Sequence, residues 1–142
     1  MTQVIIYTNS TGNVSVCVPT GELPIEEVLT KDCPEGAIVV NGSSLPQGHD
    51  NAFFDAWVLN GATVSVDINK AKKIQLVNLN NIARIEAQHR FNNDSIGIDN
   101  KISDADWKAL VQQSRLDIDE AQDTSGLVAA IVPVSNAIEA NK

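Results

Sequence analysis

The hydrophobic pattern changes its period at Ile68, and this change constrains the fold more than any other feature of the chain. Before Ile68, apolar and polar residues alternate in short runs, as at 14–18, where three valines share one face. After Ile68, glycine and proline become scarce as far as Arg90, and apolar residues recur every three or four positions. The sequence predicts an α+β fold, with a β-rich module at 1–67 and a helical module of two to three helices at 68–132.

The β-rich module is predicted to contain two hairpins with short helices. Residues 3–20 place the turn sequence NSTGN between two β-branched runs, which is the pattern of a hairpin. Pro24 and the two acids that follow Ile25 favour a helix over 24–31. A third strand is expected at 37–40, before a loop that is rich in glycine and proline.

The stretch DNAFFDAWVLNG, residues 50–61, leads into the second hairpin. Asp50 is expected to cap one or two helical turns over 51–56, and Asn60-Gly61 predicts a type I′ turn between two strands. The stretch also contains half of the six aromatic residues of the chain: Phe53, Phe54 and Trp57.

These three aromatic residues have two interpretations. As a functional site, they form a platform on which a sugar or a peptide stacks. As part of the fold, they cover the core, and this interpretation is favoured because small domains bury their few large aromatics first. Trp57 is then expected to anchor the core, with one of the two phenylalanines packed on it. The nearest apolar face belongs to the first hairpin: Val14, Val16 and Val18.

The helix predicted from Ile68 to Arg90 carries a broad apolar stripe that includes amide side chains. The apolar members of the stripe are Ile68, Ala71, Ile74, Leu79, Ile82 and Ile85. Three polar residues fall within it: Gln75, Asn78 and His89. Leu76 and Val77 fall towards its edge and on the opposite side. Such a helix is typical of packing against other chains, where an amide can fix the register. A wide core face with amides at its edge is an equally good interpretation. The candidate interface residues are Ile74, Leu76, Val77, Asn78, Ile82 and Ile85.

Two further helices and a tail are predicted in the remainder of the chain. Ser103 and Asp106 resemble a capping box at the start of the clearest helix. A third, short helix stops at Pro133, after a cap offered by the Thr-Ser pair at 124–125. Residues 133–142 have no strong start or stop signal, so this C-terminal tail is expected to fray or to order only on a partner.

Composition and motifs exclude several classes of function. The net charge of −8 and the pI near 4.5 argue against a nucleic-acid partner. No targeting segment and no apolar run of roughly 18 residues occurs, so no membrane association is expected. His49 and His89 lack metal-ligand spacing, and no nucleophile or phosphate-binding motif occurs. We therefore expect no metal, no cofactor and no enzymatic activity.

The two cysteines, Cys17 and Cys33, allow two interpretations. They could pair as a disulfide. However, a chain without a signal sequence is normally made in a reducing compartment, where cysteine more often serves as a small buried apolar residue. The second interpretation is favoured.

Over about residues 3–132, the order of turns, aromatic residues and helices resembles that of a known group of proteins. Its first part is VIIYTNSTGNVSVCVPTGELPIEEVLTKDCPEGAIVV, followed by DNAFFDAWVLNG, and its second part is ISDADWKALVQQSRLDIDEAQDTSGLVAAI. These segments resemble small proteins of tailed bacteriophages that accompany tail-fibre and baseplate components, including tail-fibre assembly proteins. The resemblance implies a non-enzymatic role in the virion or in its assembly. The chain lacks the aromatic, proline-rich ending that is usual in tail-fibre chaperones.

Two functions are compatible with these observations. The first is a structural or assembly protein that binds tail-fibre or baseplate proteins through its helices as a homo-oligomer. Such a protein would be located in the virion tail, or in the host cytoplasm during assembly. The second is a receptor- or glycan-binding tip module of a tail fibre that uses the aromatic residues Phe53, Phe54 and Trp57.

Overall fold

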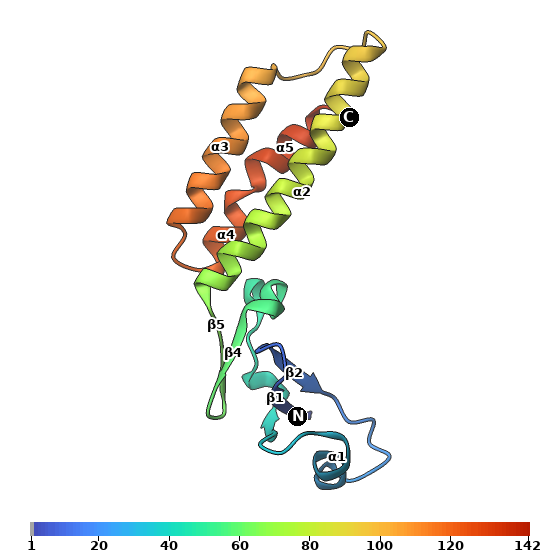
Figure 1. The fold of residues 1–142 in the computed structure, drawn as a ribbon, viewed down its shortest axis with the longest axis vertical. Helices are drawn as coiled ribbons and strands as arrows, with labels where there is room; N and C mark the ends of the chain where they lie inside the picture. The colour runs from blue at the N-terminus through green and yellow to red at the C-terminus, as the bar shows by residue number, and fades with distance from the viewer. Residues whose placement is uncertain (1) are drawn as a thin grey trace. The chain divides into compact units, whose positions relative to one another are not determined.

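The chain forms two compact units that divide between Asp67 and Ile68, in a computed structural model that describes residues 2–142. Small antiparallel sheets make up the first unit, which we call the β-rich unit, and helices make up the second, the helical unit (Figure 1). The predicted α+β class is confirmed. The division falls where the hydrophobic period changes, because the first long helix begins at Ile68.

The β-rich unit is built on a three-stranded antiparallel sheet with the strand order β2-β1-β3. The elements are β1 (Gln3–Thr8), β2 (Val14–Cys17), α1 (Ile25–Asp32) and β3 (Ile38–Asn41). In the turn between β1 and β2, the Asn9 side-chain oxygen accepts hydrogen bonds from the backbone N–H groups of Thr11 and Asn13. Gly12 adopts a positive φ of 85° in this turn, which glycine does at little cost.

The two faces of the sheet carry different sets of side chains. Ile6 pairs with Val16, so the two side chains share one face, while Ile5 pairs with Cys17 and with Val39 on the other. Ile5 and Ile6 are both 0% exposed. The central strand β1 is therefore covered on both faces.

A second sheet follows, made of one hairpin. Its strands are β4 (Trp57–Asn60) and β5 (Thr63–Val66), and two 3-10 helices precede them, η1 (Gly42–Ser44) and η2 (Gly48–Ala56). The backbone N–H of Asp67 donates to the carbonyl of Ala56 at 2.9 Å, which closes the open end of the hairpin. The second predicted hairpin is thus present, at the predicted place in the chain.

Two details of this region differ from the sequence prediction. Asp50 does not cap a helix, because η2 begins earlier, at Gly48, and has no side-chain cap. The hairpin turn does not centre on Asn60-Gly61, because Asn60 already pairs with Thr63. The two residues between them form the turn, and Gly61 supplies its positive φ of 59°. A glycine at the first central position is the pattern of a type II′ turn, not type I′.

The helical unit contains four helices within the described residues. They are α2 (Ile68–Ser95), α3 (Asp104–Glu120), α4 (Thr124–Ala130) and α5 (Val132–Ala140). Ser103 caps α3 as predicted, since its hydroxyl accepts from the N–H of Asp106 at 3.2 Å. The cap of α4 is one residue earlier than predicted, because Asp123 accepts from the N–H of Gly126 at 2.8 Å. The inner residues of α3 match the predicted spacing: Trp107, Val111, Ser114 and Ile118.

The end of the chain is the largest correction to the sequence prediction. Residues 133–142 do not form a separate tail, because α5 continues to Ala140. Val134 is fully buried and Asn141 is 4% exposed, so both ends of α5 are held in the helical unit. Pro133 lies in the first turn of α5, where its missing N–H costs no hydrogen bond.

Candidate interaction surface

Helix α2 carries the candidate site, and its inner face is largely polar. The buried residues of this face are Ala71, Gln75, Leu79, Glu86, Arg90 and Asn93. Their spacing of three, four or seven positions places them on one side of the helix. The Gln75 amide donates to the carbonyl of Leu127 on α4 at 2.8 Å. At least one amide of the predicted stripe therefore serves the unit's own core.

Arg90 ties α2 to the start of α3. Its Nη2 donates to the Ile102 carbonyl at 2.6 Å and to the Asp104 carboxylate at 2.7 Å, and its Nε donates to the same carboxylate oxygen at 3.0 Å. The Arg90 side chain is 5% exposed, while that of Asp104 is 69% exposed. Its Nη1 is buried and makes no hydrogen bond to the described part of the chain. Arg90 thus orders the connection between the two helices.

Asn141, just past α5, connects three segments of the helical unit. Its Nδ2 donates to the Glu86 carboxyl at 2.8 Å and to the Asn100 side-chain oxygen at 3.1 Å. Its Oδ1 accepts from the backbone N–H of Lys101 at 2.7 Å. Asn93 donates to the same Asn100 oxygen at 3.0 Å. This polar cluster of Glu86, Asn93, Asn100 and Asn141 joins α2, the α2–α3 connection and the chain end.

The six predicted interface residues are placed together only in part. Ile85 and Val77 are 71% and 58% exposed, and Asn78 is exposed as well. Ile74, Leu76 and Ile82 are half-buried. Since each residue advances the helix by about 100°, Val77 lies opposite the inner face of α2 and Ile85 lies on its flank.

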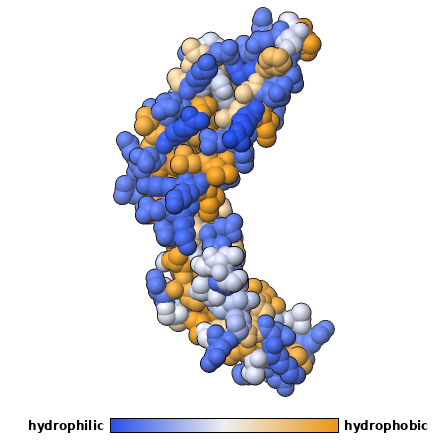
Figure 2. Space-filling view, in the orientation of Figure 1, coloured by the Kyte–Doolittle hydropathy of each residue, from blue (hydrophilic) through white to orange (hydrophobic). Residues whose placement is uncertain are grey.

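Three apolar residues that the sequence analysis did not single out extend this surface. Phe91 near the end of α2 is 65% exposed, and Ile96 and Ile98 just beyond it are 71% and 52% exposed. Figure 2 shows hydrophobic residues among hydrophilic ones over the helical unit. We call Val77, Ile85, Phe91, Ile96 and Ile98 the outer α2 surface. The sequence signal for the last three is a set of large apolar residues in an otherwise polar stretch, 91–99.

A pocket opens beside Phe91, between α2 and α3. Its volume is about 300 Å³, and Arg90, Phe91, Trp107 and Lys108 are among the residues that line it. Two exposed acids, Asp94 and Asp104, complete its rim. Aromatic walls with flanking charges suit a protruding side chain of another protein. Because Phe91 lines the pocket and also belongs to the outer α2 surface, the pocket adjoins that surface.

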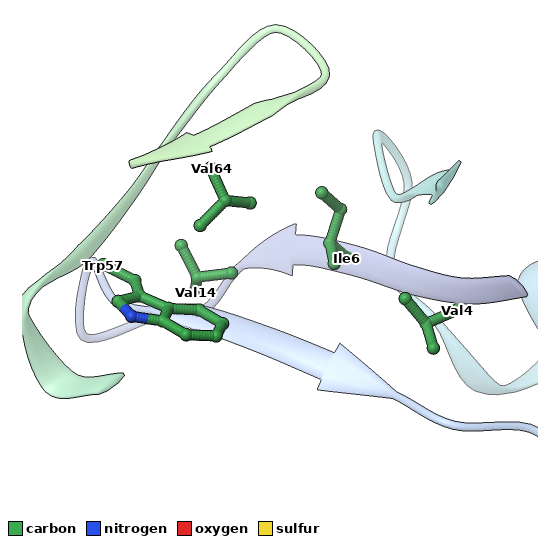
Figure 3. Packing of buried hydrophobic residues seen from close by; sticks show 5 residues of the cluster. All are labelled: Val4, Ile6, Val14, Trp57 and Val64. Carbon is green, nitrogen blue, oxygen red and sulfur yellow. The ribbon is translucent and has the colours of Figure 1, made fainter. Parts of the chain in front are cut away.

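The three aromatic residues of η2 and β4, Phe53, Phe54 and Trp57, lie mostly in the core of the β-rich unit. Trp57 is 3% and Phe53 2% exposed, and the Trp57 indole N–H donates to the Asp50 carbonyl at 3.0 Å. The rings of Phe54 and Trp57 have centroids 4.7 Å apart, as expected for a packed aromatic pair. Figure 3 shows Trp57 with the other members of its cluster, Val4, Ile6, Val14 and Val64.

The hairpin face predicted to cover Trp57 is correct in two of its three positions. Val14 belongs to the buried cluster and Val16 packs against it, but Val18 is 63% exposed. Strand β2 ends at Cys17, so the alternation does not extend to Val18. Phe54 is 39% exposed and is the member of the aromatic trio with a ring surface open to solvent.

Other classes of site have little support in the described residues. No cluster of three or more His, Cys, Asp or Glu side chains suited to a metal ion occurs among them. Among these same residues, no helix has the length and hydropathy needed to cross a bilayer. Comparisons with protein-family models, with curated proteins and with solved structures gave no match.

Proposed function

We propose that the chain is a non-enzymatic structural or assembly protein of a tailed bacteriophage, which binds a tail-fibre or baseplate protein through the outer α2 surface. The observation that carries the proposal is the exposure of five large apolar residues on a helical unit whose inner face is already covered. Val77, Ile85 and Phe91 lie on α2, and Ile96 and Ile98 lie just beyond its end. Exposed apolar residues gathered along one segment mark sites of protein–protein contact. The resemblance of the sequence to small phage tail proteins supplies the class of partner.

The proposal includes self-association of the chain. Asn78 is exposed beside Val77; its amide nitrogen donates to Gln75 at 3.1 Å, and its side-chain oxygen can accept a hydrogen bond that fixes the register of a second helix. A second copy of the chain is therefore a suitable neighbour for α2 within the larger assembly. Because the chain carries a net charge of −8, we expect the contact to depend on apolar burial more than on charge.

A glycan-binding role is the second candidate function, and it rests on the partly exposed ring of Phe54. Phe53 and Trp57 offer no comparable ring surface, because both are almost fully covered. One exposed ring stacks on a sugar less well than a platform of three. The protein-binding role is therefore better supported.

The variant Ile85→Asp tests the protein-binding role. Ile85 is 71% exposed, so an aspartate there leaves the fold intact but places a charge in the contact, which costs several kcal/mol when it is buried without a partner. A tagged chain should be produced in host cells infected with the phage that encodes it. Mass spectrometry of the purified particles and of the tag-bound fraction should detect a fibre or baseplate protein with the wild-type chain.

The matched control is Gln112→Asp, which adds the same charge at an exposed position of α3. We expect partner recovery to fall at least about tenfold with Ile85→Asp and to stay unchanged with Gln112→Asp, since about 1.4 kcal/mol of lost affinity corresponds to a factor of ten. Sedimentation of the purified chain tests self-association with the same two variants. A wild-type chain that is monomeric and recovers no particle protein would overturn the proposal.

A further inference from the structure

The two cysteines of the β-rich unit lie at the ends of neighbouring elements. Cys17 is the last residue of β2, and it shares the face of Ile5 through the pairing of these two residues. Cys33 is the residue at which α1 ends. Both carry free thiols, and both are only half-buried, so a small reagent can reach them.

Two observations place the thiols next to each other. A pocket of about 230 Å³ is lined by Cys17 together with Val28 and Asp32 of α1, and Asp32 is the neighbour of Cys33 in the chain. The Cys33 side chain also lies close to that of Cys17, since Cys17 contributes to the raised pKa of the Cys33 thiol. Burial raises the pKa of the Cys33 thiol, and the nearby Cys17 and Asp32 raise it further. The fold therefore brings the thiols together, although many residues separate them in sequence.

We propose that Cys17 and Cys33 are a redox-responsive pair, which closes to an intramolecular disulfide when a low-molecular-weight disulfide such as oxidised glutathione is present. The thiolate of one cysteine attacks a sulfur of the small disulfide, forms a mixed disulfide and releases one small thiol. The thiolate of the second cysteine then attacks the protein sulfur of the mixed disulfide and releases the second small thiol. The protein loses two electrons and two protons, and the small disulfide is reduced to two thiols.

The bond would fasten α1 to the sheet. Since the closed segment holds roughly 15 residues, the cross-link removes much of the freedom of the unfolded chain, which is the usual source of disulfide stabilisation. Oxidation is therefore expected to make the β-rich unit harder to unfold. The favoured interpretation of the sequence is confirmed for the free thiols of the reduced state, but it is wrong in one respect, because both cysteines are half-buried and not buried.

The pair can be tested by incubating the folded wild-type chain with oxidised glutathione. The mass should fall by that of two hydrogen atoms, and a digest without reductant should contain a peptide pair joined through Cys17 and Cys33. The unfolding temperature of the β-rich unit should rise by more than about 10 °C and return on reduction.

The controls are Cys17→Ser and Cys33→Ser. In each variant the remaining cysteine has no partner thiol, so it should retain one bound glutathione, whereas the wild-type chain should release it. Peptide mapping of the wild-type chain decides the question even if a variant folds poorly. Lasting glutathione adducts on both wild-type cysteines, disulfide-linked pairs of chains, or two thiols that stay unreacted would each overturn the proposal.

Discussion

Both units of the chain bury apolar side chains, but among the described residues they differ in how many polar groups they bury as well. The core cluster of the β-rich unit is apolar and consists of Val4, Ile6, Val14, Trp57 and Val64. The buried polar and charged residues all lie in the helical unit: Gln75, Glu86, Arg90, Asn93, Ser114, Thr124 and Asn141. The helical unit thus adds paired polar groups to an apolar core, and the two kinds of contact respond differently to mutation.

The difference determines which substitutions each unit tolerates. Apolar contacts are not directional, so a core such as that around Trp57 tolerates changes that keep its volume. A buried polar group requires its partner, because leaving it without a hydrogen bond costs about 1–3 kcal/mol. The cluster at Asn141 therefore holds the segment after α5 at one position.

Deletion of residues 132–142 should have the largest effect. It removes the buried Val134 and leaves the Glu86 carboxyl without the amide of Asn141. The combined cost is expected to be on the order of 5 kcal/mol or more, which approaches the whole stability of a small unit. Amide hydrogen exchange should show lost protection along α2 and α3. Protection of β1 should not change, and a helical unit that stays protected would contradict the structure of the chain end.

Trp57→Ala should damage the other unit in a different way. It leaves a large cavity beside Val14 and Val64, and cutting a buried large aromatic to alanine costs about 3–5 kcal/mol. Phe54→Ala is the matched control, because this ring is 39% exposed, and it should cost much less. Thermal melts decide between them. A shift of less than about 2 °C for Trp57→Ala would mean that the ring acts at the surface.

Asn141→Leu should have an intermediate effect. The substitution removes the amide that Glu86 and the backbone N–H of Lys101 share, and leaves Glu86 only the longer contact of 3.4 Å with His89. We expect a loss of about 2–3 kcal/mol in the helical unit. Asn136→Leu, at an exposed position of α5, should change stability by less than about 0.5 kcal/mol. Chemical denaturation of both variants measures the difference. Equal losses would show that the polar cluster has no special role.

The smallest effect concerns the reduced thiol of Cys33. Its pKa is raised in the folded chain by burial and by Cys17 and Asp32, so folding favours the neutral thiol. The resulting stability is fully present below the unfolded value of 9.0 and is lost as the pH rises through the folded pKa. Melts of the reduced chain at about pH 8 and about pH 10 should show a small loss that Cys33→Ser lacks. An equal loss of stability in the wild-type chain and in Cys33→Ser would show that the Cys33 thiol does not cause it.

The sequence predicted the elements whose signals are local. The period change at Ile68, the hairpin turns and the cap at Ser103 depend on residues close together in the chain, and each has a counterpart in the fold. The sequence does not predict α5, because a proline after an apolar run favours the end of a helix, whereas Pro133 lies in the first turn of the next one. Val134 and Asn141 then hold α5 by contacts that no local pattern encodes.

The candidate site could be predicted only in part for a related reason. Periodicity showed that α2 has apolar residues on more than one side, but it could not assign each side to the core or to solvent. The partner of Glu86 is Asn141, which lies 55 positions away, so the inner face was not identifiable from sequence. The exposed Phe91, Ile96 and Ile98 were missed because they fall where the helical period ends.

A double-mutant cycle on Glu86 and Asn141 tests most directly whether the helical unit depends on paired polar groups. Glu86→Leu, Asn141→Leu and the double variant should be compared with the wild-type chain by chemical denaturation. Each single change should cost about 2–3 kcal/mol, and the double variant should cost clearly less than the sum of the two, because either single change already removes the Glu86–Asn141 hydrogen bond. Losses that add within about 0.5 kcal/mol would mean that the two residues act independently, which would contradict this account of the helical core.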